Sequence, residues 1–109
     1  MYIAKFSVGT NESDFIDFIK TDMEHDFEIN ILNSKGLLGT EGIDIAVIGQ
    51  IAGVASAIAY TIGKFLKRNK GKSVTIENSK GKRTYSGFSA KEVKDMESFI
   101  AEDVKEISP

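Results

Sequence analysis

The longest apolar stretch of the chain, residues 43–66, dominates its pattern of hydrophobic and polar positions. No charged residue occurs in the nineteen positions from Ile45 to Gly63. Because strands usually have about four to eight residues, a stretch of this length predicts one long helix. Its large side chains recur every three or four positions and share one face, as in a helix that packs on a core: Ile43, Val47, Ile51, Val54, Ile58, Ile62 and Phe65.

The opposite face of this predicted helix carries small and weakly polar side chains. Each glycine in a soluble helix costs roughly 1 kcal/mol relative to alanine, and close approach by another element could offset that cost. We therefore predict a protein-interaction surface on this face, where another helix would pack. Its residues are Gly49, Gly53, Ser56, Ala57 and Tyr60.

Residues 45–63 also admit a second interpretation, a transmembrane helix. Nineteen residues at about 1.5 Å each nearly cross a hydrocarbon core of about 30 Å. Gly49 and Gly53 have the spacing of a close-packing motif in lipid, and a basic cluster follows the stretch. The segregation of large from small side chains favours a buried helix instead, because a single span exposes large apolar groups to lipid all round. The membrane interpretation remains as the alternative.

Shorter patterns predict the elements before this helix. Residues 2–8 are rich in β-prone side chains, and residues 27–31 alternate between apolar and polar positions, so both predict strands. Between them, Asn11 or Ser13 could cap a helix that ends near Glu24. A glycine-containing loop then leads to the long helix, for which Thr40 or Asp44 could serve as the cap.

The C-terminal part of the chain predicts a hairpin and a last helix. Strands at 73–77 and 82–88 are joined by a turn in which Gly81 suits a left-handed position. Residues 89–92 form a capping box, and the apolar stripe of the following helix continues to Ile107.

These elements predict one α+β domain over residues 1–109. The expected order is β-α-β-α(long)-β-β-α, arranged as a two-layer sandwich. A four-stranded mixed sheet would carry the helices on one face, because this arrangement buries every apolar stripe.

Composition limits the chemistry and the location of the protein. The chain contains no cysteine, which excludes disulfides and thiolate zinc sites. Its N-terminal residues lack the basic region and apolar run of a signal peptide. Both observations predict a cytoplasmic protein.

Charge is distributed unevenly along the chain. Residues 1–44 hold nine acids and three lysines, for a net −6, whereas residues 45–109 hold eleven bases and seven acids, for a net +4. The asymmetry is typical of a solvated dipole, and it also allows a basic surface that binds nucleic acid. That candidate surface comprises Lys64, Lys67, Arg68, Lys70, Lys72, Lys82 and Arg83.

No motif in the sequence indicates catalysis. The single histidine, His25, lies between two acids in a predicted loop, where adjacent side chains cannot all reach one metal ion. The chain has neither a Gly-x-Ser-x-Gly elbow nor a phosphate-binding Gly-x-x-x-x-Gly-Lys-Ser/Thr loop. We therefore predict a non-enzymatic protein without metal or other cofactors.

Four segments together resemble a known family. A glycine-bearing loop at 38–44 precedes a helix that is rich in small residues and ends in residues 64–68, and a strand at 73–77 and a turn at 81–82 follow. Over residues 27–107 this string is similar to the effector-associated constant component family of bacterial conflict systems. The family usually has tryptophan before the leucine that ends the long helix, where this chain has Phe65.

The resemblance implies a small non-enzymatic component, an adaptor or regulator, that accompanies an effector such as a protease-like protein in anti-invader defence. A protein-interaction module of this kind, with self-association allowed, is our first hypothesis. A membrane-acting protein that inserts residues 45–63 is the second hypothesis, and a small nucleic-acid-binding protein is the third.

Overall fold

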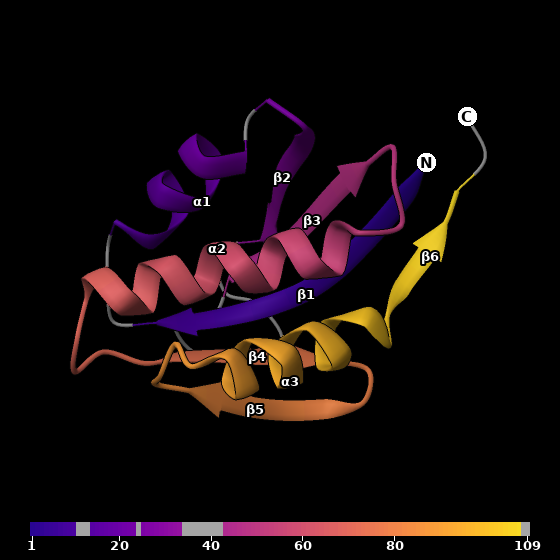
Figure 1. Cartoon of the computed structure of the whole chain (residues 1–109). Helices are drawn as coiled ribbons and strands as arrows, with labels where there is room; N and C mark the ends of the chain where they lie inside the picture. Colours follow the sequence, from indigo (N-terminus) through magenta and orange to yellow (C-terminus); the bar gives the residue numbers. More distant parts are fainter. Residues whose placement is uncertain (11–13, 24, 34–42, 108–109) are drawn as a thin grey trace.

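The computed structural model describes residues 1–10, 14–23, 25–33 and 43–107. Along these residues, strands and helices alternate irregularly (Figure 1). The strands are β1 (Tyr2–Thr10), β2 (Phe27–Asn33), β3 (Ile43–Gly49), β4 (Val74–Asn78), β5 (Gly81–Tyr85) and β6 (Val104–Glu106), and the helices are α1 (Phe15–Met23), α2 (Val54–Arg68) and α3 (Ala90–Ala101).

The strands form one antiparallel sheet in the order β2-β3-β1-β4-β5, and β6 also pairs with β1. Strand β1 is central. Its residues from Tyr2 to Val8 pair with β3 on one side. On its other side, β6 pairs with residues 2–4 and β4 pairs with residues 7–10. Lys5 therefore lies beside a gap between β6 and β4, and a cleft opens at this gap.

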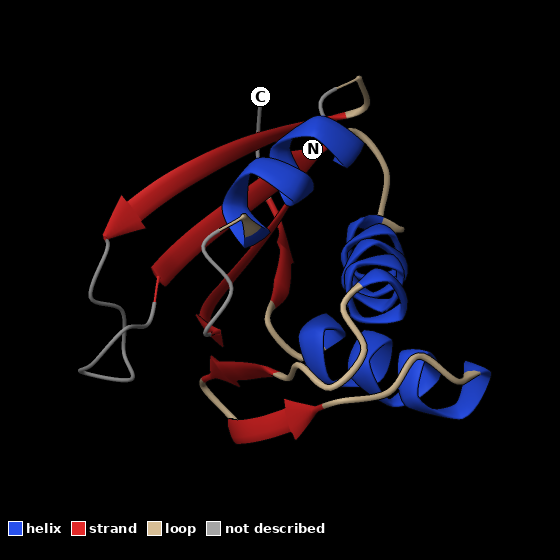
Figure 2. Cartoon of the chain, turned by 90° about the vertical axis from the view of Figure 1, so that its left-hand side faces the viewer, coloured by secondary structure: helices blue, strands red, loops and turns tan. Residues whose placement is uncertain are grey.

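The alternation along β1 shows how the sheet and the helices share a core. Ala4, Phe6 and Val8 are buried, and their neighbours on β3, Ile45 and Val47, are buried on the same face of the sheet. Figure 2 shows the helices on one side of the curled sheet. The α+β class and the placement of the helices agree with the prediction.

Three details of the predicted topology are wrong: the number of strands, their relative direction and the order of the elements. The sheet that the described residues form has six strands rather than four, and every pairing in it is antiparallel rather than mixed. The order is β-α-β-β-α-β-β-α-β, because two strands, β3 and β6, lie within segments that we predicted to be helical.

The central apolar stretch is a strand followed by a helix, not one helix. Residues 43–49 form β3, a turn occupies 50–53, and α2 begins at Val54. Ile45, Ala46 and Val47 are all buried, so both faces of β3 are covered at its centre, and a run of apolar residues is the pattern expected there. The predicted stripe is buried from Val54 onward, but Ile51 lies in the turn and is 62% exposed.

Two glycines of this stretch permit close contacts. A Cβ at Gly49 would lie 2.5 Å from Cδ1 of Phe27 on the adjacent strand, so the phenyl ring packs directly over the glycine. A Cβ at Gly63 would lie 3.0 Å from Cγ2 of Val93, where α3 crosses α2. The expected compensation for helical glycine is therefore found at Gly63, whereas Gly49 serves the sheet.

The last helix is shorter than predicted. Helix α3 ends at Ala101, and Val104 begins β6 instead of continuing the apolar stripe to Ile107. Its N-terminus agrees with the capping-box prediction, because the Ser89 hydroxyl accepts a hydrogen bond from the Glu92 N–H at 3.2 Å. The Glu92 carboxylate accepts a hydrogen bond from the N–H of Gly87, two residues before the N-cap.

The other predicted boundaries agree within a few residues. The hairpin turn between β4 and β5 has Gly81 at a positive φ of 135°, as predicted. The predicted caps Asn11, Ser13 and Thr40 lie outside the described residues. The α2 N-cap is Gly53, with no side-chain cap, so Asp44 has no capping role and lies in β3.

Candidate functional site

The predicted interaction residues divide between two places. Gly49 ends β3 beneath the Phe27 ring and is not part of a helix face. Ser56 and Tyr60 are exposed on α2, Gly53 is exposed at its N-cap, and Ala57 is half-buried between them.

We use the name α2 outer surface for the face formed by Gly53, Ser56, Ala57, Tyr60 and the exposed Ile51. It contains two large exposed side chains, Ile51 at 62% and Tyr60 at 63% exposure, separated by small residues. The Lys64 ammonium lies 4.9 Å from the centre of the Tyr60 ring and marks the C-terminal end of the surface. The result is a shallow, mostly apolar helix face with one aromatic side chain.

The predicted basic residues near the end of α2 hold α1 in place. The Lys64 Nζ lies 3.2 Å from Oδ1 of Asp22, and the buried Thr61 hydroxyl donates to Oδ2 of the same carboxylate at 2.7 Å. Arg68 lies over the ring of Phe18. Partial burial alone would raise the pKa of Asp22, but the bonds from Thr61 and Lys64 and the nearby Arg68 lower it below its usual range.

The predicted basic residue on β5 joins that strand to α3. Arg83 Nη1 donates to both carboxylate oxygens of Asp95, at 3.0 and 3.1 Å, and its guanidinium lies over the Phe99 ring. The Tyr85 hydroxyl donates to the same carboxylate at 2.8 Å. The carboxylate of Asp95 therefore accepts hydrogen bonds from two β5 side chains, Arg83 and Tyr85.

The seven basic residues do not form one surface. The C-terminal end of α2 and the hairpin turn before β5 lie at opposite ends of the helix layer (Figure 1). Lys67, Lys70 and Lys82 are exposed, and Lys72 is half-buried. With Lys64, Arg68 and Arg83 engaged in contacts between elements, this arrangement does not provide the continuous stripe that phosphate binding uses.

The Tyr85–Asp95 contact predicts a specific dependence of stability on pH. Burial and the hydrogen bond to Asp95 raise the pKa of Tyr85 from 10.0 to about 12. Between these values the folded protein retains a proton that the unfolded chain loses, so the free energy of unfolding falls as the pH rises from 10 to about 12. We expect Tyr85→Phe to be less stable at neutral pH and to show a shallower fall over this interval, as measured by urea unfolding.

Tyr60→Phe is the matched control for this prediction, because Tyr60 is largely exposed. Its free energy of unfolding should fall with pH as steeply as that of the unmodified protein. Equal slopes for Tyr85→Phe and the unmodified protein would contradict the assignment.

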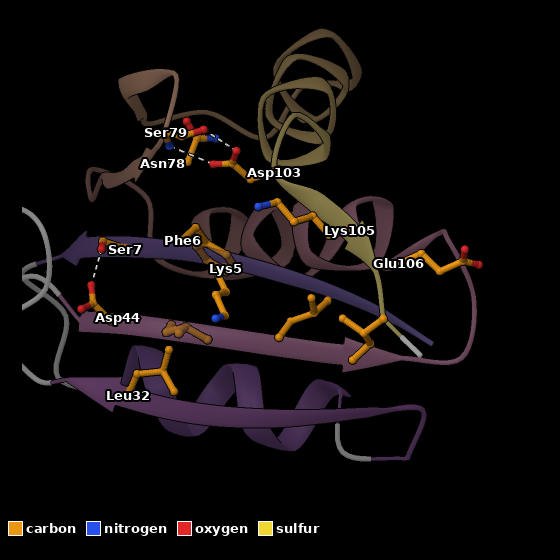
Figure 3. Close-up of a pocket in the computed structure, with 13 residues that line it drawn as sticks. Lys5, Phe6, Ser7, Leu32, Asp44, Asn78, Ser79, Asp103, Lys105 and Glu106 are labelled. Carbon is orange, nitrogen blue, oxygen red and sulfur yellow. Dashed lines mark hydrogen bonds between the residues drawn. The ribbon is translucent and has the colours of Figure 1, made fainter. Parts of the chain in front are cut away.

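A cleft of about 600 Å³ opens on the sheet face that the helices do not cover, at the gap between β6 and β4 (Figure 3). Lys5 of β1 lies at its floor, Phe6 also contributes to the lining, and Lys105 extends from β6 across the gap. The Ser7 hydroxyl donates to the Asp44 carboxylate at one end. The remaining lining residues are Ile3, Leu32, Ile45, Asn78, Ser79, Asp103, Glu106 and Ile107.

One wall of the cleft is held by contacts between the β4–β5 turn and the end of α3. The Ser79 N–H and hydroxyl both donate to the Asp103 carboxylate, and the buried Asn78 amide donates to the Phe99 carbonyl at 2.9 Å. Partial burial would raise the pKa of Asp103, but the two bonds from Ser79 and the charges of Lys105 and Lys80 lower it. Asp103 is therefore an anion at neutral pH.

The cleft has the volume of a small-molecule site and presents both signs of charge beside apolar side chains. Within the described part of the chain, no group of three or more histidine, cysteine, aspartate or glutamate side chains could hold a metal ion. His25 is exposed. The arrangement offers hydrogen bonds and ion pairs for binding.

The structure also bears on the membrane interpretation. Residues 45–63 are divided between β3 and α2, so they do not make the single helical span that we considered. No helix within the described ranges has both the length and the hydropathy that crossing a membrane requires.

Comparisons of the chain with models of protein families, with curated proteins and with solved structures give no match. The protein is therefore described by its surfaces and by its α+β fold, an antiparallel sheet with helices on one face.

Sequence reasoning found the exposed residues of α2 but missed the cleft. Its charged residues come from three segments that are distant in the sequence: Lys5, Asp44, and the group Asp103, Lys105 and Glu106. No alternation indicates β6, because Val104 is followed by two charged residues, Lys105 and Glu106. The spacing of Val104 and Ile107 continues the helical stripe of α3.

Proposed function

We propose that this protein is a non-enzymatic protein-interaction component, an adaptor or regulator, and that a partner helix binds the α2 outer surface. The observation that carries the proposal is the exposure of Ile51 and Tyr60 on either side of small residues. Aromatic side chains are enriched in the buried centres of interfaces, and tyrosine is among the residues that most often dominate binding energy. The small residues between them let a partner helix approach the backbone of α2.

The ionisable groups with shifted pKa values support the same proposal. Asp22 joins α1 to α2, Asp95 joins β5 to α3, and Asp103 joins the β4–β5 turn to the end of α3. These shifts accompany contacts that hold the fold together, and none requires a catalytic role.

The resemblance of residues 27–107 to the effector-associated constant component family suggests the kind of partner. On that basis the partner is an effector protein, such as a protease-like protein, and the process is bacterial anti-invader defence in the cytoplasm. This part of the proposal rests on the sequence resemblance.

Co-expression with the candidate effector, followed by affinity measurement, tests the proposal. We expect Tyr60→Ala to weaken binding by at least about tenfold, the effect of losing an aromatic residue at the centre of an interface. Gly53→Leu should abolish the complex by blocking the close approach. Among the residues that the structure describes, the side chain nearest to a Cβ at Gly53 is Ile51, at 3.5 Å. The backbone φ of −74° accepts leucine, so the variant should fold.

Lys94→Leu is the matched control, since it places leucine on an exposed helical position of α3. It should bind the effector as the unmodified protein does. A complex that survives both Tyr60→Ala and Gly53→Leu would refute the α2 outer surface as the partner site. An effector that binds none of the folded proteins would refute the proposed partner.

A further inference from the structure

Strand β2 lies at one edge of the sheet, and β5 lies at the other. Over the residues that the structure describes, β2 pairs only with β3, through the register from Phe27↔Gly49 to Asn33↔Asp44. An edge strand presents a row of backbone N–H and C=O groups that another strand can bind. The two edges of this sheet differ in how they limit such pairing.

The register shows which backbone groups of β2 point outward. The Met1 carbonyl accepts from the Ile107 N–H beside β6, and the direction of backbone groups alternates along a strand, so odd residues of β1 face β6 and even residues face β3. Following the pairing through β3, Glu28 and Asn30 direct their backbone groups to β3. The backbone groups of Phe27, Ile29 and Ile31 therefore point to the open edge.

The side chains of β2 do little to block this edge. Ile31 is 38% exposed and Leu32 is 56% exposed, and Phe27 and Ile29 are half-buried. Glu28 is the only charged residue in the strand, which contains no lysine, arginine or proline. Lysine, proline and short length are the usual means by which proteins protect an edge.

The opposite edge has the protection that β2 lacks. Strand β5 has five residues, and Lys82 and Arg83 are exposed near its start. By the same alternation, only Lys82 and Thr84 direct backbone groups outward. The sheet therefore has one edge that resists pairing and one that favours it.

From these observations we infer that β2 pairs with β2 of a second copy of this chain, which extends the antiparallel sheet across a two-fold axis. The axis passes beside Ile29, so that Ile29 faces Ile29 of the second copy and Phe27 faces Ile31 of the second copy. This register uses the outward backbone groups at all three positions. It also covers the exposed apolar side chains on the helix side of the sheet.

Charge and hydrogen bonding favour this register over the registers that are shifted by two residues. It places Glu28 opposite Asn30 of the second copy, and the Asn30 amide already donates to the Glu28 carboxylate at 3.1 Å within one chain. A shift of two residues in one direction would place the two Glu28 carboxylates opposite each other, which is unfavourable. The opposite shift would place Glu28 opposite Leu32. The strand is therefore self-complementary, which is what a two-fold interface requires.

The test is light scattering on the purified full chain over a range of concentrations, combined with residue-resolved amide exchange. We expect the mass to rise from one chain to two with increasing concentration. The amides of Ile29 and Ile31 should exchange fast in dilute protein and become protected as the dimer forms. The amides of Glu28 and Asn30, which face β3, should be protected at both concentrations, and that of Thr84 should not change.

Two variants separate this edge from the α2 outer surface. Ile31→Lys should keep the protein monomeric with Glu28 and Asn30 still protected, and Leu32→Lys is the second variant if the first does not fold. Tyr60→Lys should dimerise like the unmodified protein. A chain that stays monomeric up to about 1 mM, the weak end of ordinary affinities, would overturn the inference. A dimer that survives the β2 variants and is lost in Tyr60→Lys would also overturn it.

Discussion

Phe65→Ala should lower the free energy of unfolding by about 3–5 kcal/mol, the usual cost of truncating a buried phenylalanine. Phe65 is only 2% exposed and joins two helices. Its ring packs edge-on against Phe15, with centroids 4.9 Å apart, and lies 5.6 Å from the Phe18 ring. The truncation leaves a cavity between α1 and α2 that the paired rings cannot refill. Urea unfolding at neutral pH measures the change.

Tyr60→Ala is the control for Phe65→Ala, because it removes an aromatic ring from the exposed side of the same helix. Its stability should change by less than about 0.5 kcal/mol. A loss below about 1 kcal/mol for Phe65→Ala would mean that α1 is not packed against α2 as described.

Asn78→Ala should lower the free energy of unfolding by about 1–3 kcal/mol, because it leaves buried polar groups without partners. The Asn78 amide donates to the Phe99 carbonyl at 2.9 Å, and its oxygen accepts from the Lys80 N–H at 2.8 Å. The side chain therefore fixes both the hairpin turn and its contact with α3. Amide exchange should speed up in the β4–β5 turn in this variant.

Asn30→Ala provides the comparison for Asn78→Ala, since Asn30 is exposed on β2 and its amide donates to the exposed Glu28 carboxylate. Its stability should change by less than about 0.5 kcal/mol. Equal effects of the two substitutions would argue against the buried contact with α3.

Patterns confined to a short segment predicted their structures well. The alternation at 27–31, the turn at Gly81 and the capping box at Ser89 and Glu92 all agree with the structure, apart from shifts of a few residues at the strand ends. Each depends on local backbone geometry or on a contact within a few residues.

The division of residues 43–66 could not be read from periodicity. In the strand, Ile43, Ile45 and Val47 face the helices, and in a helix Ile43 and Val47 would also share a face. Gly49 and Gly53 mark the boundary, but the same spacing also suits close helix packing. Pairing with β1 and β2 on both sides of β3 is what stabilises the strand.

The surfaces were predicted only where they lie on one element. The outer side of α2 follows from the helical period, so Gly53, Ser56, Ala57 and Tyr60 lie on the predicted side of the helix or at its N-cap, whereas Gly49 was placed on the wrong element. The cleft and the open edge of β2 depend on which strands are neighbours in the sheet. No short segment of the sequence predicts that strand order.

The sequence by itself determined the α+β class, the apolar stripe of α2 from Val54 to Phe65 and the local turns and caps. These follow from side-chain periodicity and short-range hydrogen bonds. Only the tertiary structure decided that residues 43–49 are a strand, that β6 follows α3, and that the basic residues are separated. Each of these depends on contacts between distant segments, because an apolar run takes whichever conformation lets its neighbours satisfy its backbone and bury its side chains.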